Sequence, residues 1–130
     1  MDVGDRRIGY ALSDPDQSIA QPGGVVVRRG RDKDVGTIVA LARELGVERV
    51  VVGVAGEGRA AQRAMSLGRR IGRRLGVEVW VVDEDFTTVE AEQLLVQADM
   101  GRRKRKQVVD KIAAALILEA YLRGAGRRLE

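Results

Sequence analysis

The chain has 130 residues, with 23 lysines and arginines against 19 aspartates and glutamates, a formal net charge of +4, and neither histidine nor cysteine. The two absent residue types exclude histidine or thiolate zinc sites, cysteine nucleophiles, Ser-His-Asp triads and disulfide frameworks. An enzyme of this composition has to use carboxylates or lysines for its chemistry. The length is near the mode for single domains, so we expect one domain over residues 1–130.

The sequence gives no sign of a membrane or an oxidising compartment. No apolar stretch approaches the length that a transmembrane helix needs, and the N-terminal MDVGDRRIGY lacks the features of a signal peptide. We therefore expect a cytoplasmic protein with no membrane partner.

The first 28 residues predict β-strands joined by turns. Ile8, Tyr10 and Leu12 alternate with other residues before a turn signal at 13–16, and a glycine pair precedes the apolar run at 25–27.

Beyond residue 28 the pattern alternates between helices and strands. Apolar residues at helical spacing predict helices over 35–45 and 64–75, each followed by a glycine, and β-branched runs predict buried strands at 48–55 and 77–84. Apolar strands separated by helices are typical of parallel strands covered by helices, which predicts an α/β fold.

Two further helices are expected toward the C-terminus. Thr87 and Glu90 have capping-box spacing and predict a helix that continues through 91–98. The last helix is expected from Lys106 to Leu122. Its predicted buried face consists of Val109, Ile112, Ala113, Leu116 and Ala120.

Basic residues concentrate in two segments, 59–74 and 102–106. On a helical wheel the arginines of the first segment lie opposite its apolar residues, which indicates a helix with one buried and one basic face. Arginine offers forked donors to phosphate oxygens, so these segments favour a phosphate-rich partner. A solvated arginine-rich surface without a partner is an equally open reading. Aromatic residues make up only 3% of the chain, which disfavours a base-stacking surface.

Three acidic residues stand where a carboxylate is costly unless it is used. Asp2 lies at the edge of the first strand, Glu84 ends the last buried strand, and Asp110 flanks the buried face of the last helix. Side chains from these elements can converge on Mg²⁺ or Mn²⁺, which take oxygen ligands and need no histidine. Each acid also has a structural explanation, as a frayed terminus, a turn residue or a first-turn helical acid respectively.

Three segments, DVGDRRIGYALSD, DEDFTTVEAEQLL and RRKRKQVVDKIAAALILEAYL, resemble the YqgF/RuvX family in their order and spacing. The resemblance covers essentially the whole chain. It implies an RNase H-like α/β fold with a mixed five-stranded sheet, in which three antiparallel N-terminal strands precede parallel strands flanked by helices. It also implies that Asp2, Glu84 and Asp110 are catalytic and bind the metal. Members of the family are described as nucleases that process the 5′ end of pre-16S rRNA or resolve Holliday junctions.

The resulting hypothesis is a metal-dependent nuclease that hydrolyses phosphodiester bonds in pre-rRNA or branched DNA. Mg²⁺ or Mn²⁺ would be held by the three acids, and amides at the start of the last helix near Val108 would favour an anionic substrate. Symmetric cleavage of two strands would require a homodimer. The residues expected to bind nucleic acid are Arg6, Arg7, Arg102, Arg103, Lys104, Arg105, Lys106 and Lys111.

A second hypothesis is a non-catalytic rRNA-binding factor for ribosome assembly with a degenerate nuclease site. Two departures from the family motivate it. Only Met1 precedes Asp2, so either the true start lies upstream of this sequence or the first strand is shortened. In addition, Asp85 and Phe86 stand where arginine and leucine are usual. Such a factor would bind RNA with a steep salt dependence and release no metal-dependent product.

Overall fold

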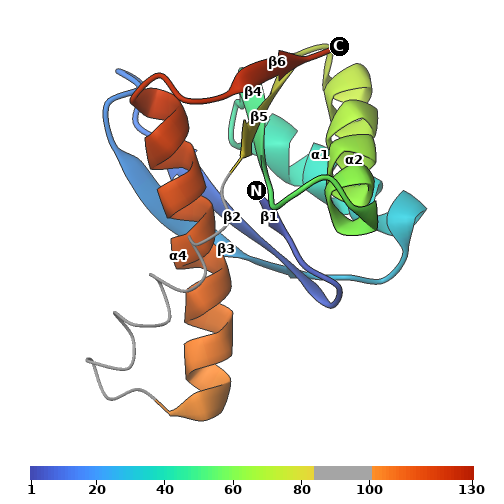
Figure 1. Ribbon diagram of the computed structural model, residues 1–130, viewed down its shortest axis with the longest axis vertical. Coiled ribbons are helices and arrows are strands. Elements are labelled where there is room, and N and C mark those ends of the chain that lie inside the picture. Colours follow the sequence, from blue (N-terminus) through green and yellow to red (C-terminus); the bar gives the residue numbers. More distant parts are fainter. Residues whose placement is uncertain (84–100) are drawn as a thin grey trace.

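The structure is a computed structural model that describes residues 1–83 and 101–130. Its described part is a mixed sheet of six strands with the order β3-β2-β1-β4-β5-β6, accompanied by three helices (Figure 1). In chain order the elements are β1 (Asp2–Val3), β2 (Arg7–Ser13), β3 (Ala20–Val27), α1 (Arg31–Glu44), β4 (Arg49–Val54), α2 (Arg59–Leu75), β5 (Glu78–Asp83), α4 (Arg102–Leu122) and β6 (Arg127–Leu129).

The predicted strand arrangement is confirmed, with one strand more than expected. β1, β2 and β3 pair antiparallel, while β1, β4 and β5 run parallel. The additional strand, β6, pairs antiparallel with β5 and places Leu129 opposite Val79. The expectation of five strands was wrong because β6 has only three residues, too few to show an alternating pattern.

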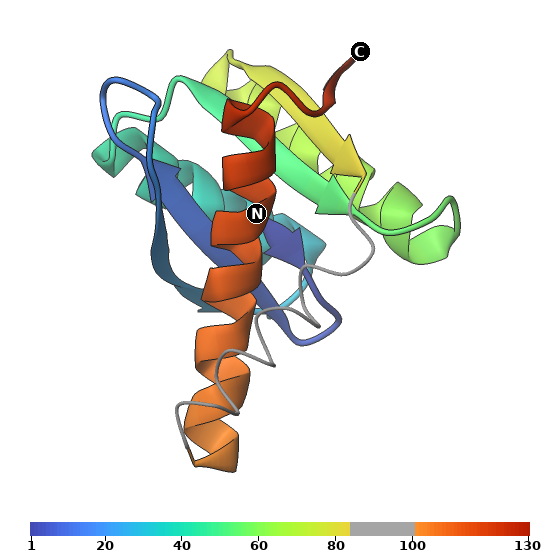
Figure 2. The same ribbon diagram turned by 60° about the vertical axis from the view of Figure 1, so that its left-hand side comes forward.

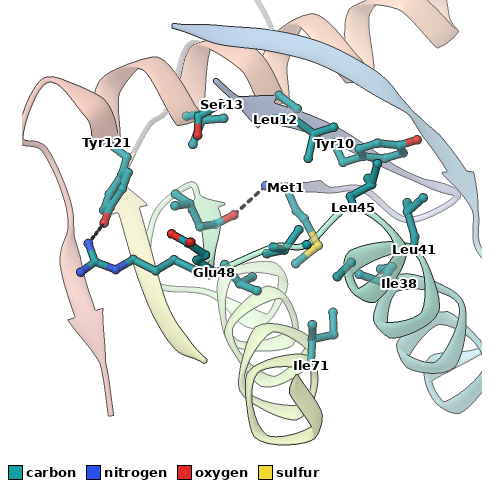
Figure 3. Close-up of a pocket in the computed structure, with 18 of the residues that line it drawn as sticks. Met1, Tyr10, Leu12, Ser13, Ile38, Leu41, Leu45, Glu48, Ile71 and Tyr121 are labelled. Carbon is teal, nitrogen blue, oxygen red and sulfur yellow. Dashed lines mark hydrogen bonds between the residues drawn. The ribbon is translucent and has the colours of Figure 1, made fainter. Parts of the chain in front are cut away.

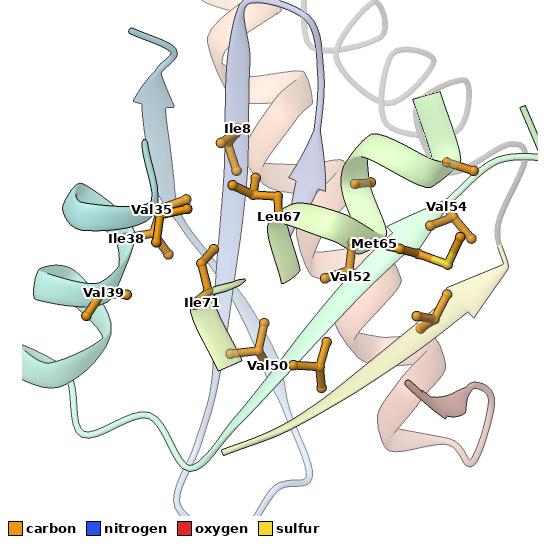
Figure 4. Packing of buried hydrophobic residues seen from close by; sticks show 14 residues of the cluster. Ile8, Val35, Ile38, Val39, Val50, Val52, Val54, Met65, Leu67 and Ile71 are labelled. Carbon is orange, nitrogen blue, oxygen red and sulfur yellow. The ribbon is translucent and has the colours of Figure 1, made fainter. Parts of the chain in front are cut away.

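Helices cover both faces of the sheet. α1 and α2 lie on one face and α4 crosses the other (Figures 1 and 2). Side chains alternate along a strand, so β4 serves both layers. Its residues Val50, Val52 and Val54 belong to the core beneath α1 and α2 (Figure 4), whereas Val51 packs with Ile117 of α4.

Two glycines allow α2 to pack closely on the sheet. A Cβ atom on Gly68 would come within 2.8 Å of Val52, and one on Gly72 would overlap Val79. These glycines lie four residues apart on the buried face of α2. At these two positions the backbone of the helix therefore rests directly on the valines of β4 and β5.

The last helix begins earlier than predicted. α4 begins at Arg102, not at Lys106, and its first backbone hydrogen bond runs from the Arg105 amide to the Gly101 carbonyl at 2.8 Å. Val108 therefore lies within the helix, and the expectation that amides near it form a helix N-terminus was wrong.

The predicted buried face of α4 was only partly right. Val109 and Ala113 are buried as expected, but Ala114 and Ile117 are buried too, and Ile112, Leu116 and Ala120 are only half-buried. At about 100° per residue, Ala114 and Ile117 lie on the opposite side of Val109 from Ile112 and Leu116, so the face toward the sheet is rotated around the helix axis relative to the predicted stripe.

The predicted helix over 91–98 lies outside the described residues. Among the helices of the described part, none combines the length and apolar character needed to cross a membrane.

Candidate active site

Asp2 lies on β1 between two glycines of the neighbouring strands. It is directly opposite Gly9 in the antiparallel pair with β2 and opposite Gly53 in the parallel pair with β4. Residues directly opposite each other in a sheet point to the same face. The two glycines therefore frame Asp2 with positions that carry no side chain.

The same glycines bring α4 down onto this part of the sheet. A Cβ atom on Gly9 would overlap the backbone of Asp110, and one on Gly53 would overlap the side chain of Ile117. Two turns of α4 are thus seated on the strands that flank Asp2. The result places Asp2 and Asp110, 108 positions apart in sequence, at one location on the α4 face.

Asp110 is held by an arginine from the second strand. The Nε atom of Arg7 donates to Oδ2 of Asp110 at 2.5 Å, and the two side chains are 31% and 21% exposed. Arg7 was expected to bind nucleic acid and Asp110 to bind metal. The structure brings them together as an ion pair.

The charge of the Asp2 carboxylate is only partly compensated by its surroundings. Burial raises the pKa of the Asp2 carboxyl above its usual range, the nearby amino group of Met1 counteracts this, and the charge of Asp110 raises the pKa further. Two carboxylates that repel each other in a partly desolvated setting are a typical arrangement for binding a cation.

The donor set fits a hard divalent cation in its chemistry. Asp2 and Asp110 offer only oxygen ligands, as Mg²⁺ and Mn²⁺ prefer. Within residues 1–83 and 101–130 no cluster of three acidic residues is close enough to hold a metal ion by itself. Glu84, the third expected acid, lies outside the described residues. It follows Asp83, the last residue of β5, which is opposite Val54 at the end of β4.

The other expected nucleic-acid contacts lie on two elements near this site. Arg6 is exposed in the turn between β1 and β2, where its carbonyl accepts a hydrogen bond from the Arg28 amide at 2.9 Å. On α4, Lys104 and Lys106 are exposed, and Arg105 and Lys111 are half-buried. Arg102 and Arg103 belong to the first turn of α4, and their side chains lie outside the described part.

Sequence reasoning missed the two framing glycines. Gly9 and Gly53 interrupt the strands RIGYALS and RVVVGV. A glycine inside a strand often marks a close approach of another backbone, and that signal was available. The identity of the approaching element was not, because it lies far along the chain.

Sequence reasoning also missed a set of hydrogen bonds that connects the loop after β1 with α1. Buried Asp34 of α1 accepts from Arg28 Nε at 3.2 Å and from the Arg29 amide at 2.9 Å, and Arg28 donates to the Gly4 carbonyl at 3.0 Å. These bonds tie the loop after β1 to the start of α1. They fix the segment that carries Asp2.

A pocket of about 390 Å³ lies elsewhere, between the start of β4, the end of α1 and the strand β2 (Figure 3). Its lining is largely apolar, with Leu41 and Leu45 among the residues, and neither Asp2 nor Asp110 lines it. At its rim Arg49 donates to the Tyr121 hydroxyl at 2.8 Å. The pocket lacks the carboxylate pair and is not the candidate active site.

Comparison with known proteins shows the family of the chain. The family described as "RuvX: Holliday junction resolvase" matches residues 1–124. The chain belongs to the RuvX family. Two relatives of the RuvX chain, from Desulforudis audaxviator and Pelotomaculum thermopropionicum, are 44% and 41% identical, and both are named "Putative pre-16S rRNA nuclease". The alignments cover 98% of this chain in both cases, and 95% and 86% of the relatives.

Solved structures support the RNase H-like architecture of this RuvX member. The RuvC protein of Thermus thermophilus in complex with a Holliday junction substrate superposes with a TM-score of 0.59 at 19% identity, covering 98% of this chain and 96% of that one. A second RuvC structure from the same organism gives 0.57 at 18% identity. These likenesses establish the fold, which confirms the predicted fold class.

Proposed function

We propose that this RuvX-family protein is a metal-dependent nuclease that hydrolyses phosphodiester bonds, with Asp2, Glu84 and Asp110 as metal ligands. The observation that carries the proposal is the meeting of Asp2 and Asp110 across Gly9, on elements from opposite ends of the chain. When bound, Mg²⁺ or Mn²⁺ would make water a stronger nucleophile and offset the negative charge that develops on the phosphate.

The residues of the chain have separate tasks in this proposal. Asp2 and Asp110 hold the cation, and the repulsion between them makes its binding more favourable. Arg7 neutralises Asp110 while no cation is bound. With substrate present, Arg7 is positioned to donate to a phosphate oxygen beside the same carboxylate, as arginine does in many phosphate sites.

The substrate is a structured nucleic acid. The relatives named for pre-16S rRNA suggest an RNA precursor, and the family description suggests branched DNA. Exposed Lys104 and Lys106 on α4, with Lys111 nearer the site, would contact the phosphate backbone on the α4 face. Symmetric cleavage of a junction would further require a homodimer.

The direct test measures cleavage of a pre-16S rRNA fragment and a four-way DNA junction, each with Mn²⁺, Mg²⁺ or a chelator. We expect metal-dependent products from the wild type and a loss of more than about 100-fold in Asp110→Asn, because a ligand of the cation is removed. Asp16→Asn is the matched control, since Asp16 is an exposed aspartate in the turn between β2 and β3. Equal cleavage by the wild type and Asp110→Asn would refute the proposal.

The alternative of a non-catalytic rRNA-binding factor has one observation in its favour. Within the described residues only two carboxylates meet, and one of them is paired with Arg7. RNA binding with steep salt dependence, unchanged in Asp110→Asn and without product under any metal, would support this alternative.

A further inference from the structure

The helix α2 carries a concentration of positive charge that the candidate active site does not use. Its 17 residues include six arginines and no acidic residue. Its buried face, which includes Leu67 and Ile71, packs on the sheet opposite to the face that α4 covers. The arginines of α2 are therefore on the far side of the sheet from Asp2 and Asp110.

Four of these arginines form a straight row. At about 100° per residue, Arg59, Arg63, Arg70 and Arg74 fall within about 60° of one another around the helix axis. With a rise of about 1.5 Å per residue, the row extends over about 22 Å. Arg73 lies beside it. Phosphates along a nucleic-acid strand repeat over such a length, so one backbone can contact several members of the row.

Folding does not account for most of this charge. Arg70 is paired with Asp32 of α1, and Arg69 donates to the Glu130 carbonyl at 3.2 Å. Arg59, Arg63, Arg73 and Arg74 are exposed, and their guanidinium groups have no hydrogen bond or ion pair to any residue of the described part. Four unpaired cations on one helix repel one another, which costs stability in the free protein.

The chemistry of this surface favours a nucleic-acid backbone over other anionic partners. None of the exposed large hydrophobic residues in the described part, namely Ile19, Val27 and Leu45, lies on α2. A protein partner usually requires an aromatic or apolar anchor at the centre of its interface, and an interfacial membrane helix requires apolar side chains that insert. Arginines without such anchors match the phosphate contacts that hold nucleic acid without reading its sequence.

The position of the row connects it with the candidate active site. β4 ends at Val54, one residue after Gly53, which flanks Asp2, and α2 begins at Arg59. Figure 2 shows α2 beginning beyond the arrowhead of β4 and returning behind the sheet. The row therefore starts at the sheet edge where β4 ends and leads away from it on the opposite face.

We propose that the arginine row of α2, comprising Arg59, Arg63, Arg70 and Arg74 with Arg73 beside it, is a second binding surface for the phosphate backbone of the nucleic-acid substrate. The inference rests on the proposed nuclease function and extends it. A substrate that contacts both α4 and α2 has to pass around the sheet edge, so the surface selects long or branched nucleic acids over short ones. Its contacts are independent of base sequence.

The test uses the full chain with Arg59, Arg63, Arg73 and Arg74 replaced together by glutamine, which preserves helix propensity. Arg70 is kept because it pairs with Asp32. Binding of a long labelled RNA hairpin and a long labelled DNA duplex, each able to pass around the sheet edge, is measured over a salt series in a chelator. We expect affinity to fall at least about tenfold at low salt, and the slope of log affinity against log salt to decrease by about 0.9 for each lost contact with duplex DNA.

The matched control replaces the same four residues by lysine. Because lysine retains the charge, the salt slope of this variant should stay close to that of the wild type. Thermal unfolding of both variants shows whether a loss of nucleic-acid binding is due to misfolding. Vesicles that contain phosphatidylserine serve as the competing anionic surface.

The outcomes separate the row from the proposed function. If the glutamine variant keeps the affinity and salt slope of the wild type while the wild type cleaves with Mn²⁺, the proposed binding surface on α2 is wrong and the proposed nuclease function stands. If the glutamine variant loses binding and the wild type shows no cleavage with any metal, the binding surface on α2 is supported and the nuclease function is rejected. Vesicle binding that depends on the row, with RNA and DNA binding unaffected, would also overturn the inference.

Discussion

The position of Asp2 between Gly9 and Gly53 determines how the candidate site is built. With no side chains on either flank, the backbone of α4 reaches the sheet, and the Asp110 carboxylate arrives beside Asp2 from the helix. A larger residue at either glycine would separate the two acids. The glycines are therefore part of the site although they carry no functional group.

The first prediction concerns Gly9→Ala. The added methyl group would overlap backbone atoms of Asp110, which cannot rotate away, so α4 has to shift. Overpacking of this kind costs about 1–3 kcal/mol of stability, and a misplacement of about 1 Å can lower a reaction rate by about 100-fold. Urea unfolding and the metal-dependent cleavage assay measure the two effects.

Gly58→Ala is the matched control for this substitution. Gly58 precedes α2, its φ is −78°, and a Cβ atom there would meet nothing within 4 Å. The control should retain cleavage. Wild-type cleavage by Gly9→Ala would show that the close approach of α4 to the sheet is not needed for the reaction.

The second prediction concerns the charge of Asp2 without metal. Because burial raises the pKa of Asp2 in the folded state, the folded protein holds this proton more tightly than the unfolded chain does. The resulting stability is fully present below the unfolded pKa and is lost as the pH rises through the folded pKa. At neutral pH in a chelator, Asp2→Asn should therefore have a higher free energy of unfolding than the wild type. In acid the difference between the two proteins should be smaller.

Asp2→Asn should at the same time lose metal-dependent cleavage, so stability and activity change in opposite directions. The pH series of urea unfolding compares it with Asp16→Asn, whose position in the turn after β2 is exposed. A free energy of unfolding lower than that of the wild type for Asp2→Asn at neutral pH would contradict the conclusion that the buried Asp2 charge destabilises the folded protein.

At the scale of elements, α2 and the sheet pack through glycines in the same way as the active-site face does. Gly72 lies against Val79 of β5 and Gly68 against Val52 of β4. The buried face of α2 is thereby fixed against the sheet, and the arginines are fixed on its outer side. Packing on one side of the helix sets the direction of the charged row on the other.

The third prediction compares two glycines inside helices. Gly72→Ala should destabilise the protein by about 1–3 kcal/mol, because the methyl group overlaps the side chain of Val79 in a packed layer. Gly36→Ala in α1 should stabilise it by up to about 1 kcal/mol, since a Cβ atom there meets nothing and alanine is the better helix former. Thermal or urea unfolding measures both. Similar effects of the two changes would contradict this account of the α2 packing.

The elements were largely predictable because their signals are local. Helical spacing fixed the end of α2 before Gly76, and β-branched runs fixed β4 and β5. β6 was missed because RRL has no periodicity and forms only through pairing with β5. The buried face of α4 was partly misplaced because the helix is rotated on the sheet, so that Ala114 and Ile117 are buried, and the apolar spacing of the helix does not indicate this rotation.

The candidate site was predictable in its residue types and less so in its geometry. Composition restricted the chemistry to carboxylates or lysines, and the position of Asp110 beside an apolar stripe made it a candidate. The pairing of Arg7 with Asp110 joins residues 103 positions apart, and no local pattern indicates it. Whether Glu84 completes the set stays a prediction.

For the whole molecule, a net charge of +4 conceals two separated basic surfaces. α4 presents Lys104 and Lys106 on one face of the sheet, and α2 presents its arginine row on the other. Acidic residues elsewhere in the chain reduce the net charge, but they do not cancel the positive potential at these two surfaces. If both surfaces bind nucleic acid as proposed, a strand held by the two would pass the end of β4, close to Asp2, which is paired with Gly53.

The last prediction tests whether one substrate contacts both surfaces. Lys104 and Lys106 are replaced by glutamine, alone and together with the four arginine replacements on α2. The two sets lie on opposite faces of the sheet, so their losses in binding free energy should add within about 0.5 kcal/mol on a long or branched nucleic acid. A short hairpin binds one surface at a time, so each single set should cost it little while the other surface remains, and the combined variant should lose more than the sum of the two single losses. Equal additivity on short and long substrates would mean that the two surfaces do not bind one continuous molecule.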